Sequence, residues 1–401
     1  MLHYGCKVNQ YETNGMIQKF EESGYIIKEM NEKADIYIVN TCTVTNMADK
    51  KSRQMLRRMK KLNPNSIIVA CGCYVQVSGN EVEKMEEIDL VLGNNEKNSI
   101  VEKVEDYIKN TNNKMYISDV LHKTEFEEFG KTIHTETTRA VIKVQDGCDR
   151  FCSYCIIPYA RGHVRSRKIE NIVEEIKEIA IRGIKEVIIT GIHIASYGKD
   201  FKENVGLIDL LEEINKIEGI ERIRLGSLEP KIIDEKFIQR LKEMKKICHH
   251  FHLSLQSGCD SILRRMNRRY TTKEFENVVK ILRNTYEDVI LTTDIIVGFP
   301  GETEQEFIET KKYLEKIKFY KMHVFPYSKR KGTKAANMEN QIDEKTKAKR
   351  CRELIDLSNK NLQEYNKSYI GKVVKVLFEE EHGIYIEGHT DNYLCVKVEK
   401  K

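Results

Sequence analysis

Three cysteines stand close together near the middle of the chain. Cys148, Cys152 and Cys155 have the spacing C-x3-C-x2-C. Iron–sulfur clusters normally take four cysteine thiolates, so three thiolates in one loop can hold three irons of a [4Fe–4S] cluster and leave the fourth open. An open coordination position is where a metal site does chemistry. The alternatives are a zinc loop, which usually needs paired C-x2-C arms or histidines, and three buried cysteines.

A second set of three cysteines is spread over the first 75 residues. Cys6, Cys42 and Cys73 each follow a short apolar run or open a loop. Taken singly, each is more often a small buried residue. Loops at the carboxyl ends of parallel strands converge on one crevice, so their shared placement favours a second cluster with an open iron. Cys71 continues the apolar run before Cys73, which predicts that Cys71 belongs to the core.

The elements that carry this second set form an open α/β domain over residues 1–109. Short apolar runs alternate there with amphipathic stretches, a pattern typical of buried parallel strands and covering helices. The predicted strands are 36–39, 67–70 and 90–92, and the predicted helices are 11–23, 47–62 and 96–109. A polar stretch without periodicity predicts a linker over 110–133.

Strand-like and helix-like stretches alternate over residues 134–364, a pattern that predicts a partial (β/α)6 barrel beginning just before the C-x3-C-x2-C loop. Six strand-plus-helix units are too few for a full eight-unit barrel. The predicted strands are 140–145, 187–190, 222–226, 251–256, 289–297 and 321–326, with helices near 168–182, 207–217, 234–246, 272–285 and 303–317. Function gathers in the loops after such strands. The loop after the third strand places the hydroxyl of Ser227 and the carboxylate of Glu229 at the barrel mouth.

The C-terminal part predicts a helix over 341–366 and then a small antiparallel β module over 367–401. The runs 373–378, 383–388 and 393–398 alternate apolar and polar residues between turns. About thirty residues are too few to close a barrel of their own.

Composition narrows the class of protein. Of 401 residues, 40% are hydrophobic and 32% charged, as in a well-cored globular protein. Neither a signal peptide nor an apolar run of about 18 residues is visible, so we expect a cytoplasmic protein without a membrane span. Eleven cysteines without an export signal indicate reduced thiols that include metal ligands. Four of them are expected to be structural: Cys248, Cys259, Cys351 and Cys395.

The net charge of +5 is too small to name a partner, but the basic residues cluster. The two basic regions either follow a phosphate backbone or are ordinary solvated helix faces. The first comprises Lys50, Lys51, Arg53, Arg57, Arg58, Lys60 and Lys61, and the second Lys329, Arg330, Lys331, Lys345, Lys347, Lys349, Arg350 and Arg352. Four histidines near the barrel are expected to have packing or surface roles: His193, His249, His250 and His252.

The motifs together resemble a known family. The C-x3-C-x2-C loop, with Tyr154 before its last cysteine, resembles the radical S-adenosylmethionine (SAM) signature. The whole chain resembles the methylthiotransferase branch of that superfamily, with an N-terminal three-cysteine domain, a radical core and a short C-terminal TRAM-like module. The motifs most similar to the enzymes that act on N6-threonylcarbamoyladenosine in tRNA are Gly5–Glu12 (GCKVNQYE), Asn40–Thr45 (NTCTVT), Gln145–Cys148 (QDGC) and Val324–Ser328 (VFPYS).

The resemblance implies a reaction and its cofactors. Two [4Fe–4S] clusters and two equivalents of SAM would insert a methylated sulfur at C2 of the modified adenine at position 37, beside the anticodon. Cys148, Cys152 and Cys155 would generate the radical, and Cys6, Cys42 and Cys73 would hold the cluster that carries sulfur. Tyr154 would pack near the SAM adenine, and Ser227 and Glu229 would contact its ribose or methionine. An electron donor such as a flavodoxin or ferredoxin and an unspecified sulfur donor are also implied.

Three alternatives remain open at this point. A sister enzyme would act on isopentenyladenosine in tRNA, and another branch modifies a ribosomal protein. The pair Lys7 and Val8 after Cys6 argues against both of these enzymes, by resemblance alone. A non-catalytic iron–sulfur protein that binds RNA belongs to a different class, but carriers normally close their clusters with four ligands.

Overall fold

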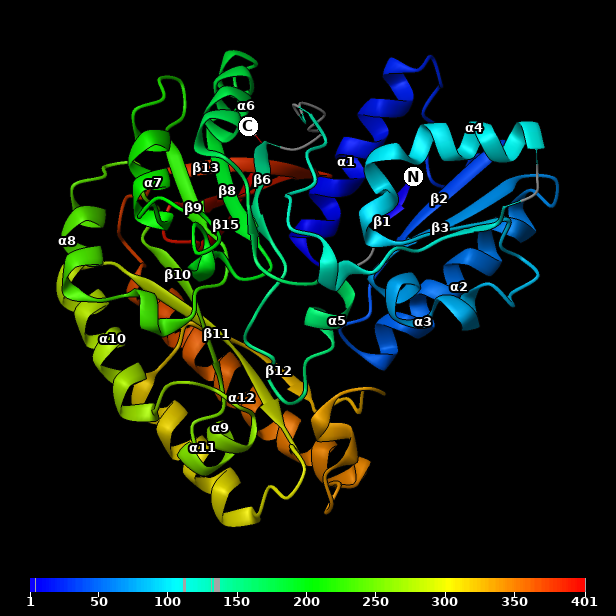
Figure 1. Cartoon of the computed structure of the whole chain (residues 1–401). Helices are drawn as coiled ribbons and strands as arrows, with labels where there is room; N and C mark the ends of the chain where they lie inside the picture. The colour runs from blue at the N-terminus through cyan, green and yellow to red at the C-terminus, as the bar shows by residue number, and fades with distance from the viewer. Residues whose placement is uncertain (4, 111–112, 131, 133–137, 401) are drawn as a thin grey trace.

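The computed structural model describes residues 1–3, 5–110, 113–130, 132 and 138–400. Its N-terminal part is a five-stranded parallel sheet in the order β1-β2-β3-β4-β5 (Figure 1). The strands are β1 Leu2–His3, β2 Ile36–Thr41, β3 Ile67–Gly72, β4 Leu90–Leu92 and β5 Met115–Tyr116. The helices are α1 Lys7–Glu22, α2 Asn46–Leu62, α3 Cys73–Val82 and α4 Ile100–Asn110, the last preceded by the 3-10 turn η1 Asn94–Ser99.

Alternation along β3 explains why this sheet is covered on both faces. Val69 and Cys71 pack with α1 and α4 on one face, while Ile68 and Ala70 pack with α2 and α3 on the other. A parallel sheet buried on both sides reads as a continuous apolar run, which is the pattern from which the open α/β fold was predicted. The predicted linker departs from expectation, because its residues Met115 and Tyr116 pair with β4 as the edge strand. Residues 111, 112, 131 and 133 of that linker lie outside the described chain.

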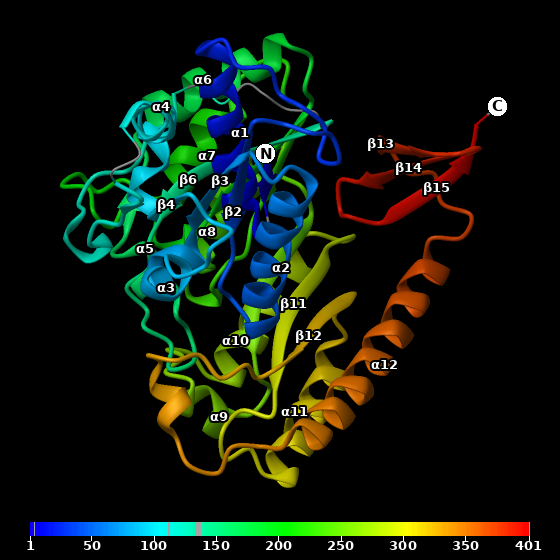
Figure 2. The same ribbon diagram turned by 90° about the vertical axis from the view of Figure 1, so that its right-hand side faces the viewer.

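The central part is an open barrel of six parallel strands, which confirms the partial (β/α)6 fold (Figures 1 and 2). β6, β8 and β9 pair in sequence, as do β10, β11 and β12, and single bridges at Ile223–Ile247 and Leu228–Leu253 join the two groups. The strands are β6 Arg139–Asp146, β8 Glu186–Gly191, β9 Arg222–Leu225, β10 His250–Gln256, β11 Ile290–Val297 and β12 Lys321–Pro326, with a short antiparallel edge β7 Arg165–Ser166.

Amphipathic helices cover the outside of this barrel. They are α6 Ile169–Ile181, α7 Leu207–Asn215, α8 Glu235–Lys242, α10 Thr272–Thr285 and α11 Glu304–Ile317, with shorter α5 Ile157–Arg161 and α9 Asp260–Arg265. Capping boxes start α10 and α11, where Thr271 pairs with Glu274 and Thr303 with Glu306. Such boxes satisfy backbone N–H groups that the first helical turn leaves free, which fixes where α10 and α11 begin.

The C-terminal part begins with α12 Glu344–Ser368, which packs beside β12 (Figure 2). It leads into an antiparallel sheet of β13 Val376–His382, β14 Tyr385–Thr390 and β15 Cys395–Glu399, an open β module as predicted. Arg222 and Arg224 at the start of β9 donate hydrogen bonds to the backbone oxygens of His389 and Asp391, at 3.0 and 2.9 Å. The module therefore sits at the strand-start end of the barrel.

A buried charge network fastens the N-terminal part to the barrel. The Glu12 carboxylate on α1 accepts from the Nζ of Lys97 at 2.5 Å, the Nζ of Lys143 at 2.7 Å and the Nη1 of Arg161 at 2.6 Å. Burial alone would raise the pKa of the Glu12 carboxyl, but these three cations hold it well below its usual range. Removing one partner of a buried ion pair leaves an uncompensated charge, so this network holds the two parts in one arrangement.

No helix in the described residues is both long and apolar enough to cross a lipid bilayer.

Candidate active site

The C-x3-C-x2-C loop leaves the end of β6 through a tight turn. Gly147 has φ +71°, and a Cβ there would lie 1.7 Å from the backbone oxygen of His163, so only glycine fits. The Cys148 backbone N–H donates to the oxygen of Gly162 at 3.0 Å. The Ser153 hydroxyl donates to the oxygen of Arg265 at 2.8 Å. The loop is therefore held at both ends by hydrogen bonds to backbone oxygens.

The three thiols of this loop lie near one another and are partly buried. Burial, and then the neighbouring Cys152, raises the pKa of Cys155 to about 12, and burial raises that of Cys148 to about 11. The Nη1 of Arg268 lies 3.4 Å from the Cys152 sulfur. Thiols of this kind ionise when a metal takes the sulfur, and an arginine beside them favours the thiolate.

The second set meets at the carboxyl edge of the N-terminal sheet. Gly5 packs so closely that a Cβ there would lie 2.5 Å from the Cys42 sulfur. Cys73 opens α3, and its sulfur receives the Nε of Arg161 at 3.2 Å and the Nδ2 of Asn94 at 3.6 Å. Burial and then the charge of Cys73 raise the pKa of Cys42 to about 12. The structure thus brings together three cysteines that span 67 residues of the chain.

Cys6 is at this edge of the sheet, whereas Cys71 lies in the core. Cys6 is exposed at the mouth of a cavity. The protein atoms around its sulfur nevertheless raise its pKa by displacing water, while the positive charge of Arg161 acts in the opposite direction. Cys71 is fully buried among apolar side chains and lies 3.7 Å from the oxygen of Val39. Its place in the core agrees with the sequence prediction.

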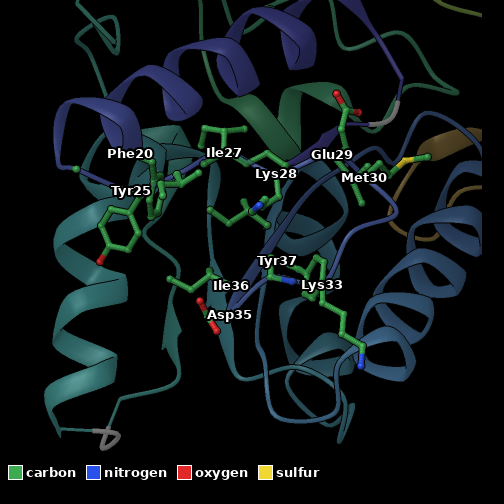
Figure 3. Close-up of a pocket in the computed structure, with 16 residues that line it drawn as sticks. Phe20, Tyr25, Ile27, Lys28, Glu29, Met30, Lys33, Asp35, Ile36 and Tyr37 are labelled. Atoms are coloured by element: carbon green, nitrogen blue, oxygen red, sulfur yellow. Dashed lines mark hydrogen bonds between the residues drawn. The ribbon is translucent and has the colours of Figure 1, made fainter.

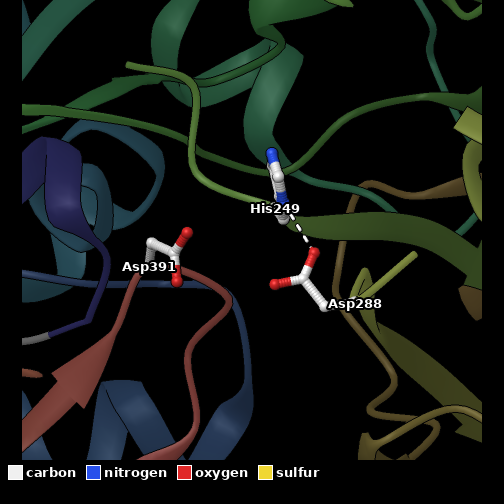
Figure 4. A group of neighbouring side chains, drawn as sticks. All are labelled: His249, Asp288 and Asp391. Carbon is white, nitrogen blue, oxygen red and sulfur yellow. Dashed lines mark hydrogen bonds and ion pairs between the residues drawn. The ribbon is translucent and has the colours of Figure 1, made fainter. Parts of the chain in front are cut away.

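The donor chemistry of both sets fits an iron–sulfur cluster better than zinc. Tetrahedral zinc with Zn–S bonds of about 2.3 Å brings its sulfurs to within about 4 Å of one another. Among the described residues, neither cysteine set is that compact; the group whose ligand atoms lie within 4.8 Å of one another is His249, Asp288 and Asp391 (Figure 4). Three thiolates without a fourth protein ligand leave an open metal position.

A cavity of about 640 Å³ lies between the second cysteine set and the barrel. Cys6 and Cys42 line one wall, and Ser227, after β9, lines the other. Phe325 near the end of β12 is 44% exposed at the same cavity. The side chains that line it therefore come from the N-terminal part, the barrel and, through Tyr393, the C-terminal module.

The remaining residues singled out in the sequence lie at the barrel mouth, with different neighbours. Tyr154 packs against a buried cluster that includes Met266, Phe299 and Tyr327. Glu229 is 3% exposed and forms a 2.7 Å salt bridge with Arg150 inside the cysteine loop. Glu229 also lies 2.6 Å from His193, and despite its burial these partners lower its pKa to about 2. The carboxylate is already engaged in holding the loop.

Sequence reasoning missed the polar side chains that touch the cysteines. Arg161, Arg268 and Asn94 carry no local motif, and only the fold brings them to a sulfur. Lys7 also went unassigned. It lines the cavity beside Cys6, where the surrounding walls and then the charges of Arg139 and Arg224 lower its pKa.

The prediction that Lys329–Arg352 contacts a phosphate backbone is wrong for three of its cations. Arg330 is buried against Asp49 at 2.6 Å, and Arg350 is buried against Glu302 at 2.7 Å. Lys347 is also buried, beside Glu344. These charges are neutralised inside the protein. The members that remain exposed are Lys329, Lys331, Lys345, Lys349 and Arg352. Of the four cysteines expected to be structural, three are buried and Cys395 is exposed.

A smaller cavity of about 410 Å³ lies apart from the cysteines (Figure 3). Phe20 and residues 24–30 and 33–38 form most of its wall, and its labelled side chains mix apolar groups with lysines and carboxylates. Its described lining residues include no cluster of ligating or nucleophilic groups.

Comparison with known proteins decides the family. The Radical SAM superfamily profile matches residues 142–314, and the profile described as "Uncharacterized protein family UPF0004" matches residues 1–93. The threonylcarbamoyladenosine tRNA methylthiotransferase MtaB of Bacillus subtilis (strain 168) is 40% identical over 399 residues, covering 98% of this chain and 88% of that one. The chain belongs to the radical SAM methylthiotransferase family.

Other members of the family and a solved structure agree. MtaB of Aquifex aeolicus (strain VF5) is 40% identical over 98% of this chain and 95% of its own. The tRNA-2-methylthio-N(6)-dimethylallyladenosine synthase of Thermoanaerobacter sp. (strain X514) is 38% identical over 94% of this chain and 81% of its own. The radical SAM methyltransferase TsrM of Kitasatospora setae superposes with a TM-score of 0.60 at 14% identity, covering 78% of this chain and 69% of that one. That likeness shows the fold.

Proposed function

We propose that the protein is a tRNA methylthiotransferase that converts N6-threonylcarbamoyladenosine at position 37 to its 2-methylthio derivative. The observation that supports this most directly is the shared cavity. It lies between two cysteines of the N-terminal set and the inner wall of the radical SAM barrel. A base placed there would lie beside Cys6 and Cys42 and against the barrel.

The cysteines divide the proposed work. Cys148, Cys152 and Cys155 hold one [4Fe–4S] cluster, and Cys6, Cys42 and Cys73 hold a second. With two equivalents of SAM, these clusters supply the radical, sulfur and methyl chemistry that an unactivated aromatic C–H requires. Arg268 and Arg161 stabilise a thiolate in each set through their hydrogen bonds to Cys152 and Cys73.

The other site residues position the reactants. Tyr154 packs beside the SAM adenine, and Ser227 offers a hydroxyl to SAM or to the base. Glu229 orients the cysteine loop through its salt bridge to Arg150, so its effect on SAM is exerted through that loop. The exposed ring of Phe325 provides a stacking surface for a base taken out of the anticodon loop.

The remaining assignments belong to the same proposal. The domains are 1–109 for the second cluster, 110–133 as linker, 134–364 as radical core and 367–401 as RNA-binding module. The anticodon loop of tRNA is the macromolecular partner, a flavodoxin or ferredoxin is the reductant, and the reaction takes place in the cytoplasm.

Mass spectrometry of tRNA nucleosides from cells lacking this gene tests the proposal. We expect the 2-methylthio form of threonylcarbamoyladenosine to disappear and the unthiolated form to accumulate. Loss of the methylthio-dimethylallyl nucleoside instead would assign the sister substrate.

Substitution of neighbouring cysteines tests the second cluster. Cys73→Ala should halve the iron bound per chain and abolish methylthiolation. Cys71→Ala, two residues away in the core, is the matched control and should keep the iron. Retention of both clusters in Cys73→Ala would remove Cys73 from the ligand set.

A further inference from the structure

The cavity between the cysteine set and the barrel has a strongly basic end. Asp294 is the one carboxylate among its described lining residues, and His252 already binds it at 3.1 Å. The basic side chains that line the same cavity are Lys7, Arg224, Lys321, His250, His252 and His323. All except Lys7 come from β9, β10 and β12 of the barrel.

Positive charge is in excess at this end because several cations share few carboxylates. Glu186 lies within 4 Å of three arginines, at 3.9 Å from Arg139, 3.6 Å from Arg222 and 2.6 Å from Arg224. Glu379 is shared between Arg139 and His389. Among the described residues that line the cavity itself, Lys7, Arg224 and Lys321 carry positive charge and Asp294 is the one carboxylate. A further anion would bring the charges closer to balance.

The Lys7 ammonium is the cation best placed to receive that anion. In the described part of the chain, the ammonium groups of Lys7 and Lys321 have no hydrogen bond or ion pair, whereas Arg224 is held by Glu186 and by backbone oxygens. Of the two lysines, Lys7 is the one beside Cys6, on the cysteine side of the cavity. Lys7 is also the first residue of the 16-residue helix α1, whose N-terminus carries partial positive charge. Its side chain lines the cavity together with that of Arg224.

Polar groups continue this surface along the barrel wall. The Oγ1 of Thr292 lies 2.9 Å from the Nε2 of His250 and 3.0 Å from the Nδ1 of His252. The ring of Tyr393 stacks on His250 with 4.6 Å between centroids and closes the far end. From Lys321 to Phe325 the cavity follows β12 for about 13 Å, at about 3.3 Å per residue. That length accommodates an adenine with an extended N6 substituent.

We propose that this basic end binds the carboxylate of the threonylcarbamoyl group, with Lys7 as its direct ion-pair partner. The inference rests on the proposed function and deepens it, because it assigns substrate choice to a residue. The threonyl group ends in a carboxylate, whereas a dimethylallyl group is an uncharged hydrocarbon. A hydrocarbon offers the Lys7 ammonium no counter-ion, so the same residue that favours one base disfavours the other.

A phosphate of the RNA backbone shares the anionic chemistry, and the experiment separates the two sources. Two anticodon stem–loop RNAs are compared, one carrying threonylcarbamoyladenosine and one in which its carboxylate is a primary amide. Their KM, kcat and equilibrium binding are measured with the reconstituted wild-type enzyme, Lys7→Met, Lys7→Arg and the control Lys19→Met at the other end of α1. Binding by fluorescence anisotropy gives a readout that does not depend on turnover.

We expect the amide to weaken wild-type binding and raise KM by about 10- to 100-fold, as for removal of a charge-assisted hydrogen bond. Lys7→Met should bind the carboxylate RNA as weakly as wild type binds the amide, with no further loss on the amide. Lys7→Arg should recover part of the discrimination, and Lys19→Met should match wild type. Iron content and the absorption spectrum show whether the neighbouring cluster is intact.

Two outcomes overturn the inference. If Lys7→Met weakens both RNAs by the same factor, Lys7 binds the RNA backbone. If wild type binds both RNAs equally, the cavity does not read the carboxylate, although methylthiolation of the first RNA would leave the proposed function standing. Failure of the proposed function is a different result, in which wild type methylthiolates neither RNA but does methylthiolate a dimethylallyladenosine RNA.

Discussion

The Nε of Arg161 lies 3.2 Å from the sulfur of Cys73, although 88 residues separate them. Arg161 ends the short helix α5 that follows the C-x3-C-x2-C loop, and its Nη1 also lies 3.1 Å from the carboxylate of Asp146. Asp146 is two residues before Cys148. One guanidinium therefore touches the second cysteine set and the strand that carries the first, which couples their relative positions.

Arg161→Met should destabilise the fold and loosen the second cluster. The substitution leaves the buried carboxylates of Glu12 and Asp146 short of a partner. Breaking a buried ion pair in this way costs about 3–5 kcal/mol. Urea unfolding measures the loss, and iron per chain should fall toward that of one cluster.

The control is Arg240→Met, at an exposed arginine that pairs with Asp209 and Glu212. This substitution should cost no more than about 1 kcal/mol. Equal stability of the two variants would contradict the coupling.

Gly147→Ala should prevent the first cluster from assembling. Its left-handed φ costs an L-residue about 1–2 kcal/mol, and the added Cβ would also lie 1.7 Å from a backbone oxygen. Gly183→Ala is the matched control, because Gly183 has φ +89° with open space around it. We expect Gly183→Ala to lose only the conformational part and to keep its iron, while Gly147→Ala loses iron and melts lower. Normal iron in Gly147→Ala would show that the turn can relax.

Much of this architecture was readable because apolar periodicity and caps mark long elements. The barrel strands and covering helices fall within a few residues of their predicted ranges. Short elements were missed for physical reasons. α3 contains Gly79 and β-branched valines and has non-helical angles at Ser78, so its sequence carries little helical signal. β5 has two residues and exists because β4 offers an edge for pairing.

The residues of the site also fall into a group that could be predicted from the sequence and a group that could not. Cysteine spacing could be recognised because ligands of one loop are close in sequence, and strand ends suggested where Cys6, Cys42 and Cys73 meet. The groups around them could not be predicted. Arg330 is buried because it pairs with Asp49, and Lys7 lines one cavity with Arg224, which lies far from it in the sequence. Such pairs are set by the tertiary fold and leave no local pattern.

The exposed cations of α2 should bind the tRNA backbone. Lys50, Lys51 and Lys61 are exposed, and no ion pair is recorded for them in the described chain. Reversing all three to glutamate should weaken tRNA binding at least 10-fold. The slope of log K against log salt should become shallower by about 0.7–0.9 for each phosphate that the variant no longer neutralises. Filter binding at several salt concentrations measures both quantities.

The control for that prediction carries the same change of net charge on another face. Lys236, Lys242 and Lys245 are exposed on and after α8, which lies on the opposite side of the molecule from α2 (Figure 1). Their triple reversal should leave the salt slope close to that of wild type. Equal weakening by both triple variants would mean that only overall charge matters.

The stability that Glu306 contributes should disappear in acid. Its carboxylate is held by Arg265 at 2.8 Å, and this hydrogen-bonded ion pair lowers the pKa of Glu306 to about 2, below its ordinary value of 4.5. Because the folded-state pKa is the lower one, the contribution is complete above about pH 4.5 and is lost as the pH falls toward 2. The difference in unfolding free energy between wild type and Glu306→Gln should therefore be constant from pH 8 to 5.5 and shrink below about pH 4.5.

Glutamine is the substitution of choice because it can still cap α11, so the helix start is preserved. A Glu306→Gln difference that stayed constant to pH 3 would refute the assignment.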